Sequence, residues 1–600
     1  MDCQDDYKRN MTNAEIARIL REIAFFLEME EIPFKPRAYE KAAYAIEALD
    51  APLDEIYRRG RIKAVEEVPG VGRSIAEKLV TLIETGKLPY YEGLRLKSPV
   101  DIEQLTAIEG LGPKKVKVLY DQLGIRTVDD LERAALEGKI HQLPHFGEKS
   151  EQKILKGISF FKKSGSRYPI GVILPVIRDI ERLLEKVPGV KRLAVAGSIR
   201  RWKETIGDGD LLAVSNDPDR VMDFFISMPE VIYIHAKGPT KSSIKIKSGI
   251  DVDLRVVPEE SFGAALCYFT GSKAHNIHLR KIAIGKGLKL SEYGVFRGER
   301  PIAGRTEEEV YAALGLPFIP PELREETGEI ESALAERLPN LIDYDELRGD
   351  LQTQTNWTDG AYSIEEMAAE AKRLGREYIA ITDHTKSLAM AKGSDEKRLR
   401  KQMAAIDELN KKLRGITLLK GAEVNIDKDG RLDIDDETLA RLDVVGIAVH
   451  SHFGLSREQM TRRVIRAMEN PHADILFHPT GRIIQKREPY EIDIDAVIQA
   501  ARRTGTALEV DAFPDRLDLK DEHIRKAVEA GVKLVIDSDA HHIHHLSYLQ
   551  FGIATARRGW AKRSDVLNTL PLNAFLASLK DGKERGRKKH FGVMQVRKGR

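Results

Sequence analysis

Carboxylates stand close together in two short apolar segments near the middle of the sequence. Asp208 and Asp210 open the run DGDLLAVS, and Asp253 lies in the run IDVDLR. On a strand, residues i and i+2 share a face, so Asp208 and Asp210 point the same way. Three converging carboxylates bind two Mg²⁺ ions, which hold the attacking and leaving oxygens of a phosphoryl transfer. The alternative interpretation is a pair of surface strands whose acids are solvated.

Histidines and carboxylates follow almost every apolar run in the C-terminal part of the sequence. The residues in question are Asp383, His384, Glu423, His450, His478, Asp539 and His541. The carboxyl ends of successive parallel strands meet at one mouth, so we expect these side chains to converge there. Mixtures of imidazole and carboxylate suit Zn²⁺, Mn²⁺ or Fe. A single such histidine could cap a strand instead, but five strand ends with the same feature favour a metal centre.

Three related segments near the N-terminus join a turn to an amphipathic helix. They are VPGVGRSIAEKL, IEGLGPKKVKVL and LPHFGEKSEQKIL, and their turn glycines are Gly70, Gly72, Gly110, Gly112 and Gly147. Glycine lets the backbone approach a phosphate, and the free N–H groups of the helix start then face the anion. The segments resemble helix-hairpin-helix elements, which hold DNA backbones without reading sequence. The third departs from the pattern, because His145 replaces its first glycine.

The elements that must position these residues change along the chain. Residues 1–165 show helical spacing, with helices expected over 15–28 and 36–49, and residues 193–256 show strand patterns. A helical stretch is expected over 261–315, before a Pro-rich and acidic linker. From residue 347 apolar runs alternate with helical stretches, at 347–351, 378–382, 416–419, 444–449, 475–477, 507–510 and 534–536. Seven such units predict a parallel sheet, either closed into a barrel or doubly wound.

Composition limits the class of protein. The 600 residues are 42% hydrophobic and 32% charged, which indicates a soluble globular protein of several domains. No apolar run approaches the ~18 residues of a membrane span, and two cysteines exclude a disulfide framework and suit a reducing cytoplasm. The net charge is only +2, but the segment from Lys580 onward is rich in Lys and Arg. That tail is a candidate phosphate-binding arm or a solvated terminus.

The central motifs resemble those of family X DNA polymerases, the DNA polymerase beta group. The matching segments are GSIRR at 197–201, the Asp208-x-Asp210 pair, Asp253-x-Arg255, YFTGS at 268–272, 276–280 and SEYG at 291–294. The resemblance covers residues 12–325. It implies that Asp208, Asp210 and Asp253 bind Mg²⁺ or Mn²⁺ and that Ser198 and Arg201 hold a deoxynucleoside triphosphate. It further implies that Tyr268 and Phe269 exclude a 2′-OH. Asn276 would contact the incoming base, and Arg280 would lie on the template side.

The N-terminal residues are similar to the small lyase domain of the same family. Residues 34–39 and 71–78 match its two signature stretches. The resemblance implies that Lys35 binds a 5′-phosphate and that Lys78 is the Schiff-base lysine. A second lysine of the family is Ser74 here, which weakens the electrostatic case for an activated amine. The helix-hairpin-helix elements could also hold a monovalent cation.

The histidine-rich part resembles the polymerase-and-histidinol-phosphatase (PHP) domain, a distorted seven-stranded barrel with up to three metals. Matching positions imply one metal at Asp359, His384 and His541 and a second at Glu423, His450 and His478. The third would be bound by a His-x-His motif with Glu423 and Asp539, but Gln352 and Gln354 stand at both histidine positions. A neutral amide is a poorer ligand than imidazole, so occupancy of this third site should fall.

These observations divide the chain into seven expected parts. They are a lyase-like domain (1–90), helix-hairpin-helix fingers (91–165), a palm (166–260), a thumb (261–325), a linker (326–346), a PHP barrel (347–578) and a basic tail (579–600). The expected fold class is multidomain α+β and α/β, with helical N-terminal domains, a nucleotidyltransferase palm sheet and a C-terminal β/α barrel.

Three functions remain open from the sequence. The first is a repair polymerase that fills short gaps in DNA. The second is a nuclease in which the barrel trims 3′ ends or cuts abasic sites, and the third is a non-catalytic scaffold that bridges DNA ends. The complete carboxylate set favours the first over the third, and the two glutamines count against the second. We expect a bacterial, cytoplasmic monomer without membrane contact.

Overall fold

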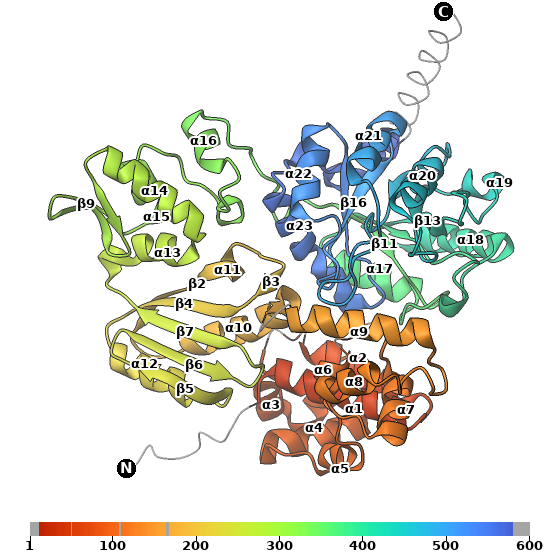
Figure 1. Ribbon diagram of the computed structural model, residues 1–600, viewed down its shortest axis with the longest axis horizontal. Helices are drawn as coiled ribbons and strands as arrows, with labels where there is room; N and C mark the ends of the chain where they lie inside the picture. Colours follow the sequence, from red (N-terminus) through yellow and green to blue (C-terminus); the bar gives the residue numbers. More distant parts are fainter. Residues whose placement is uncertain are drawn as a thin grey trace, which may run out of the picture.

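The computed structural model describes residues 11–47, 49, 51–106, 108, 110–163 and 167–579. The basic tail, apart from Leu579, lies outside the described residues. Within the described residues, none of the helices has the length and apolar character needed to cross a membrane. Figure 1 shows the N-terminal helices below, a sheet and a smaller helical part on the left, and the C-terminal barrel on the right.

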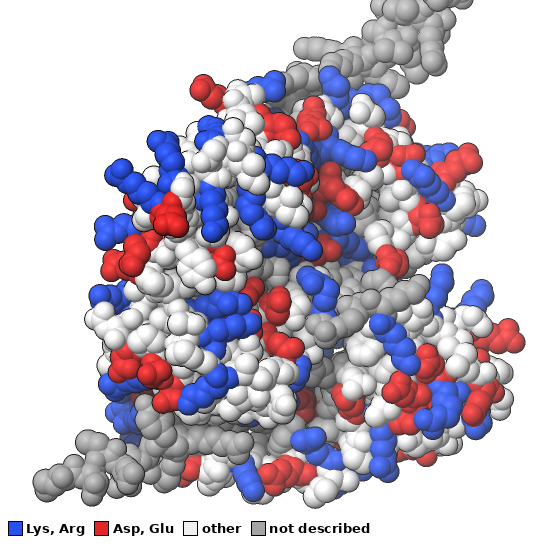
Figure 2. All heavy atoms as spheres, turned by 60° about the vertical axis from the view of Figure 1, so that its left-hand side comes forward, with Lys and Arg blue, Asp and Glu red and all other residues white. Residues whose placement is uncertain are grey.

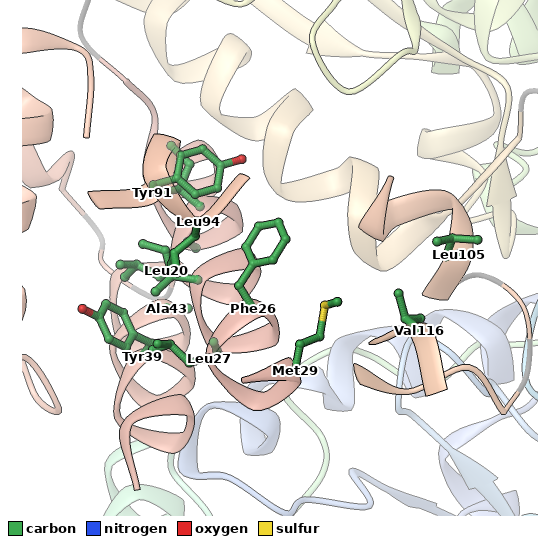
Figure 3. Packing of buried hydrophobic residues seen from close by; sticks show 14 of the residues in the cluster. Leu20, Phe26, Leu27, Met29, Tyr39, Ala43, Tyr91, Leu94, Leu105 and Val116 are labelled. Carbon is green, nitrogen blue, oxygen red and sulfur yellow. The ribbon is translucent and has the colours of Figure 1, made fainter. Parts of the chain in front are cut away.

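The N-terminal part is helical, as predicted. Its helices are α1 (Asn13–Met29), α2 (Lys35–Glu47), α3 (Leu53–Glu66), α4 (Arg73–Thr85), α5 (Pro89–Lys97), α6 (Ile102–Thr106), α7 (Pro113–Leu123), α8 (Val128–Leu136) and α9 (Glu148–Lys163). Helix α1 starts at a capping box, in which Thr12 accepts from the backbone of Glu15. Leu20 and Leu27 of α1 pack in one core with Tyr39 of α2 and Leu94 of α5 (Figure 3).

The palm is a five-stranded sheet with helices on both faces. Its order is β2 (Val190–Val195), β4 (Asp208–Ser215), β7 (Asp251–Val256), β6 (Lys241–Ile246) and β5 (Val231–Lys237), and only β4 and β7 run parallel. Side chains alternate along β4, so Leu211 packs toward α10 (Ile170–Glu185) and α12 (Pro218–Ser227). Leu212 packs on the other face, in one cluster with Phe262 of α13 (Phe262–Thr270). Asp208 and Asp210 therefore lie on the face of α13.

The thumb contains strands where the sequence predicted only helix. Helices α13, α14 (Lys273–Gly285) and α15 (Glu307–Ala313) flank a small antiparallel sheet of β8 (Lys289–Ser291), β9 (Gly294–Arg297) and β10 (Arg300–Ala303). The helical prediction for residues 261–315 was wrong over these strands. Gly294 and Gly298 have positive φ angles of 146° and 62°, which turns the chain between strands too short to show a period of two.

The C-terminal part is a nearly closed parallel barrel of seven strands. They are β11 (Gly349–Thr353), β12 (Tyr378–Ile381), β13 (Thr417–Asn425), β14 (Val444–Ala448), β15 (Ile475–Leu476), β16 (Ala507–Asp511) and β17 (Leu534–Asp537), paired in chain order. A parallel bridge between Thr353 and Ala540 brings the first and last strands together. This order has no reversal, which excludes the doubly wound alternative. Strand β13 is longer than the predicted run at 416–419, so Glu423 lies inside the strand and not after it.

Helices surround the barrel. They are α17 (Ile364–Arg373), α18 (Glu396–Lys412), α19 (Asp436–Leu439), α20 (Arg457–Met468), α21 (Ile494–Thr504), α22 (Asp521–Glu529) and α23 (Leu549–Arg558). Phe551 of α23 and Leu517 are buried in the same hydrophobic cluster as Ile173 of the palm helix α10. The palm and the barrel thus share a core.

We expect Phe551→Ala to destabilise the palm together with the barrel. Removing a buried phenylalanine side chain costs about 3 kcal/mol, because a cavity remains. Phe575→Ala is the matched control, since Phe575 is buried in a cluster of barrel residues only. Limited proteolysis with mass identification of the fragments should show earlier cleavage of palm peptides in the first variant only. Equal protection of the palm in both variants would contradict the shared core.

Candidate active sites

The two strands that carry the acidic residues lie side by side. Strands β4 and β7 pair in parallel, with Asp208 opposite Asp251 and Asp210 opposite Asp253. Burial raises the pKa of Asp210 to about 6, and the neighbouring charges of Asp208 and Asp253 add to this effect. Three carboxylates held together in this way repel one another unless a cation lies between them. Divalent metal ions fit this donor set, and the like-charge repulsion is the observation that favours them.

Strand β6 orients Asp253. Ser243 donates a hydrogen bond to Asp253 Oδ1 at 2.5 Å, and Lys241 Nζ lies 2.7 Å from Asp253 Oδ2. Neither Ser243 nor Lys241 was predicted from the sequence. Their alternation on the strand KSSIKI puts them on one face of β6, but only the pairing of β6 with β7 shows that this face meets the acids.

A short helix beside the acids presents Ser198 and Arg201. Helix α11 (Gly197–Arg200) starts with Gly197 at a φ of 63°, and a Cβ there would lie 2.4 Å from Asp210 Oδ2. The turn therefore needs glycine, both for its conformation and for the close carboxylate. Among the described residues, the buried Ser198 hydroxyl has no hydrogen-bond partner. Arg201 Nε lies 3.0 Å from Glu325 Oε1, and Arg201 also donates to the carbonyl of Thr270.

A hollow of about 530 Å³ brings most of the predicted polymerase residues together. Its lining includes Ser198, Arg201, Asp208, Asp210, Tyr268, Phe269, Asn276 and Arg280. Figure 2 brings this side of the molecule forward and shows Lys and Arg side chains gathered on its upper part, where the thumb lies in Figure 1. A concave site with both carboxylates and cations can bind a metal together with a polyphosphate.

The wall of the hollow is formed by the end of α13 and by α14. The rings of Tyr268 and Phe269 meet edge to face with centroids 5.0 Å apart, and both side chains are half-buried. Asn276 Nδ2 donates to the Tyr268 carbonyl at 2.7 Å, and the Arg280 guanidinium lies 5.9 Å from the Tyr268 ring. Cys267 is buried next to them, which fits packing better than chemistry.

The three turns near the N-terminus share one backbone conformation. Gly70 and Gly110 have φ angles of 80° and 82°, and His145 takes the same left-handed conformation with a φ of 69°. The following glycines, Gly72, Gly112 and Gly147, precede α4, α7 and α9, and a Cβ on any of them would meet no atom within 4 Å. The helix starts are therefore open to an external ligand, including the third one, whose sequence departs from the pattern.

The two predicted lysines lie on different helices. Lys35 is exposed at the start of α2. Lys78 Nζ on α4 donates to the carbonyl and the hydroxyl of Ser74, both at 3.0 Å, and lies 5.1 Å from the Tyr90 ring. Serine thus stands where the family has a second lysine near Lys78.

The barrel mouth gathers the predicted metal ligands around Glu423. His450 Nε2 and His478 Nε2 both lie 2.9 Å from Glu423 Oε1, and His384 Nδ1 lies 3.2 Å from Oε2 without the alignment of a hydrogen bond. Asn425 Oδ1 holds His450 Nδ1 at 2.6 Å, which fixes the imidazole ring as second-sphere partners of metal ligands do.

A second group at the mouth lies toward the solvent. Asp359 Oδ2 is 3.6 Å from His384 Nε2 and 3.7 Å from His541 Nε2. The ligand atoms of Asp359, His384 and His541 lie within 4.8 Å of one another, and so do those of His384, Glu423 and His450. Mixed imidazole and carboxylate donors at this spacing fit two metal ions.

The side chains at the predicted third metal position are less suited to binding a metal ion than the two groups above. Gln354 Nε2 donates to Glu423 Oε2 at 2.8 Å and lies 3.4 Å from Asp539 Oδ1. The Gln352 amide faces the Glu509 carboxylate, so its nitrogen must point toward that group. The Arg516 guanidinium lies 3.5 Å from Asp539 Oδ2. Donor amides and a fixed cation therefore surround the carboxylates that a third metal would need.

The histidines after His541 have a different role. The His542 ring packs against Tyr44 of α2 and Tyr362, each with centroids 4.6 Å apart. Burial lowers the pKa of His542 to about 3. His542, His544 and His545 belong to none of the metal-binding groups found among the described residues, and the first of them joins the barrel to the N-terminal helices.

Family models match four parts of the chain. A helix-hairpin-helix domain matches residues 11–88, a SAM-like helix-hairpin-helix tandem 102–159, the DNA polymerase beta thumb 265–325 and the PHP domain 350–541. The helix-hairpin-helix and thumb matches mean that the chain binds DNA.

Relatives extend these matches to most of the chain. The DNA polymerase/3'-5' exonuclease PolX of Bacillus subtilis is 39% identical over 575 residues, which cover 95% of this chain and 100% of that protein. The chain belongs to the family X DNA polymerases that carry a PHP domain. A DNA polymerase lambda of Arabidopsis thaliana is 25% identical over 48% of the chain and 57% of its own length. A probable phosphatase of Thermoanaerobacter sp. is 32% identical over 37% of the chain and 89% of its own length.

Family X polymerases and PHP domains use divalent metal ions, and this chain holds residue groups able to bind them. The helical, palm, thumb and barrel parts agree with the predicted fold class. The domain limits and the residue roles inferred from the sequence stay predictions. The structure gathers the polymerase residues at one hollow and the PHP residues at one mouth, with Asp253 positioned through β6.

We expect the double variant Gln352→His/Gln354→His to bind more transition metal than the parent chain. Imidazoles at both positions would restore nitrogen donors beside Glu423 and Asp539. Elemental analysis after dialysis should show up to one additional metal per chain. Gln352→Asn/Gln354→Asn is the control and should leave the metal content unchanged. An equal content in all three proteins would refute the importance of the two amides.

Proposed function

We propose that this family X DNA polymerase fills short gaps in duplex DNA by two-metal nucleotidyl transfer. The observation that carries the proposal is the alignment of Asp210 and Asp253 on adjacent parallel strands, next to a hollow that also contains Ser198 and Arg201. A non-catalytic scaffold would not need buried like charges, which cost stability unless a ligand compensates them.

In the proposed reaction, each residue acts on one part of the nucleotide or primer. Asp208, Asp210 and Asp253 would hold Mg²⁺ or Mn²⁺, which supplies Lewis-acid stabilisation of the developing charge. The Ser198 hydroxyl, which lacks a partner among the described residues, is free to donate to a phosphate oxygen, and Arg201 neutralises the triphosphate. The Asp253 carboxylate would receive or relay the proton of the primer 3′-OH as its oxygen bonds to the α-phosphorus, and the α–β phosphoanhydride bond breaks to release pyrophosphate. Tyr268 and Phe269 form the wall against a 2′-OH.

The N-terminal helices would grip the DNA on either side of the gap. The open helix starts after Gly72, Gly112 and Gly147 suit backbone phosphates, and Lys35 suits a downstream 5′-phosphate. A monovalent cation could complete the helix-hairpin-helix contacts. We assign Lys78 a lyase role only as a secondary hypothesis, because Ser74 replaces the cation that would activate its amine.

For the barrel, we propose a weakened 3′-5′ exonuclease. Two groups of side chains that share His384 would hold Zn²⁺, Mn²⁺ or Fe, but Gln354 and Arg516 disfavour the third position. Cleavage that needs three metals should therefore be slow. We further propose that the chain works as a cytoplasmic monomer.

Replacement of both Asp208 and Asp210 by alanine should abolish nucleotide incorporation while DNA binding stays near the parent level. The reason is that the pair holds metal but does not form the DNA-gripping surface. The assay uses a labelled primer on gapped duplex, with incorporation read on a gel and binding by fluorescence anisotropy. Near-parental incorporation by the double variant would refute the assigned site.

The same gel tests the barrel when nucleotides are omitted and Mn²⁺ is present. We expect little or no shortening of the primer, because the third metal position is disfavoured. Rapid shortening that persists in the Asp208→Ala/Asp210→Ala variant would show that two metals suffice. Shortening that disappears in that variant would assign the activity to the polymerase site instead.

A further inference from the structure

The loop after α11 is held by the barrel. Arg558 of α23 donates from Nη1 to the Arg201 carbonyl at 2.8 Å. The Trp202 ring packs edge-on against Phe551 with centroids 5.7 Å apart, and Arg482 Nη2 lies 2.9 Å from Glu204 Oε2. These three contacts fix to the barrel the segment that carries the Arg201 side chain toward the nucleotide hollow.

One carboxylate links the same two arginines through their side chains. Glu325 is the last residue of the thumb, and its Oε1 lies 3.0 Å from Arg201 Nε and 3.1 Å from Arg558 Nη1. Lys203 Nζ lies 3.7 Å from Glu325 Oε2. Arg558 is held in turn by Asp521 of α22, with Nη2 2.6 Å from Oδ2. Arg201 and Arg558 thus share one oxygen atom of a largely buried carboxylate.

This sharing has a consequence for the nucleotide site. A triphosphate that binds Arg201 must compete with Glu325 for the guanidinium. Arg558 neutralises part of the Glu325 charge at the shared oxygen, so it weakens the hold of Glu325 on Arg201. Because these side chains are mostly buried, water screens the competition less than it would at a surface.

We propose that the PHP barrel positions the triphosphate-binding arginine of the polymerase site, with Arg558 as the positioning residue. Arg558 holds the Arg201 backbone and shares Glu325, which keeps the Arg201 guanidinium available to the nucleotide. The inference rests on the proposed role of Arg201 in binding the triphosphate. It gives the barrel a part in DNA synthesis that does not depend on its own metals.

The test is steady-state incorporation kinetics of the full chain on gapped DNA with Mg²⁺. Arg558→Gln should raise the KM for the nucleotide about fivefold, as expected for the loss of a coupled charge pair, with kcat changed less than about twofold. Glu325→Gln should lower the KM, because it removes the competitor. The double variant should have a lower KM than Arg558→Gln alone, because it also removes the competitor, and purely structural damage would not produce such a rescue.

Arg557→Gln is the matched control. Arg557 is the neighbouring buried arginine of α23, but its Nε pairs with Glu322 at 2.7 Å instead of with Glu325. We expect its KM to equal that of the parent. A similar rise in this variant would indicate general loosening of α23 and would overturn the proposal.

Two further results separate failure of the inference from failure of the proposed function. Arg201→Ala should raise the KM whatever residue stands at position 325. If it does not, the assigned role of Arg201 is wrong, and the inference falls with it. If it does, but Arg558→Gln leaves the KM unchanged or the double variant only adds to the damage, the inference alone is overturned. Should Arg558→Gln fail to fold, a raised KM in Glu325→Gln refutes it.

Discussion

The enforced closeness of Asp210 and Asp253 is the constraint on which the polymerase half depends. Parallel pairing of β4 with β7 places the two carboxylates opposite each other, and burial raises the pKa of Asp210 to about 6. The surroundings serve this arrangement. Gly197 leaves room for the Asp210 carboxylate, and Ser243 and Lys241 orient Asp253. The backbone thus concentrates negative charge that divalent cations can compensate.

The barrel also contains buried carboxylates, but different groups surround them. Glu423 is buried at the centre of three imidazoles, which supply the donors of a metal centre. On its other side, Gln354 and Arg516 meet the carboxylates directly. The burial of Glu509 and Asp511 raises the pKa of both groups, and neighbouring acids add to this. Protonation of the buried acids, the donor amides and the Arg516 guanidinium therefore take the place of a metal ion at this position.

The two catalytic halves are mechanically one unit. Residues of the barrel complete the core of the palm, and the segment that follows α11 lies against α23. A domain joined only by a flexible linker would leave the polymerase site independent of the barrel. Here the shared core and the buried ion pairs make the position of Arg201 depend on residues more than 300 positions away in the chain.

The sequence by itself determined those features of the protein that depend on residues close together in the chain. The period of two on 208–215 and 251–256 identified the acids and their shared face, and the glycine turns identified the open helix starts. Histidines after successive strands identified the predicted metal-binding mouth of the barrel. Gln352 and Gln354 showed that the motif at these positions departs from the His-x-His pattern of PHP domains. These features depend on residues a few positions apart, whose relation is fixed by backbone geometry.

Only the tertiary structure decided which distant groups meet. The strands β8–β10 were missed because they are too short to show a period. The left-handed conformation of His145 was missed because glycine is the usual signal for it. Arg516 beside Asp539, and Glu325 between Arg201 and Arg558, were invisible to local patterns, because packing of separate elements creates these contacts. Ion pairs between residues far apart in the sequence are set by the fold, and the spacing of residues along the chain does not predict them.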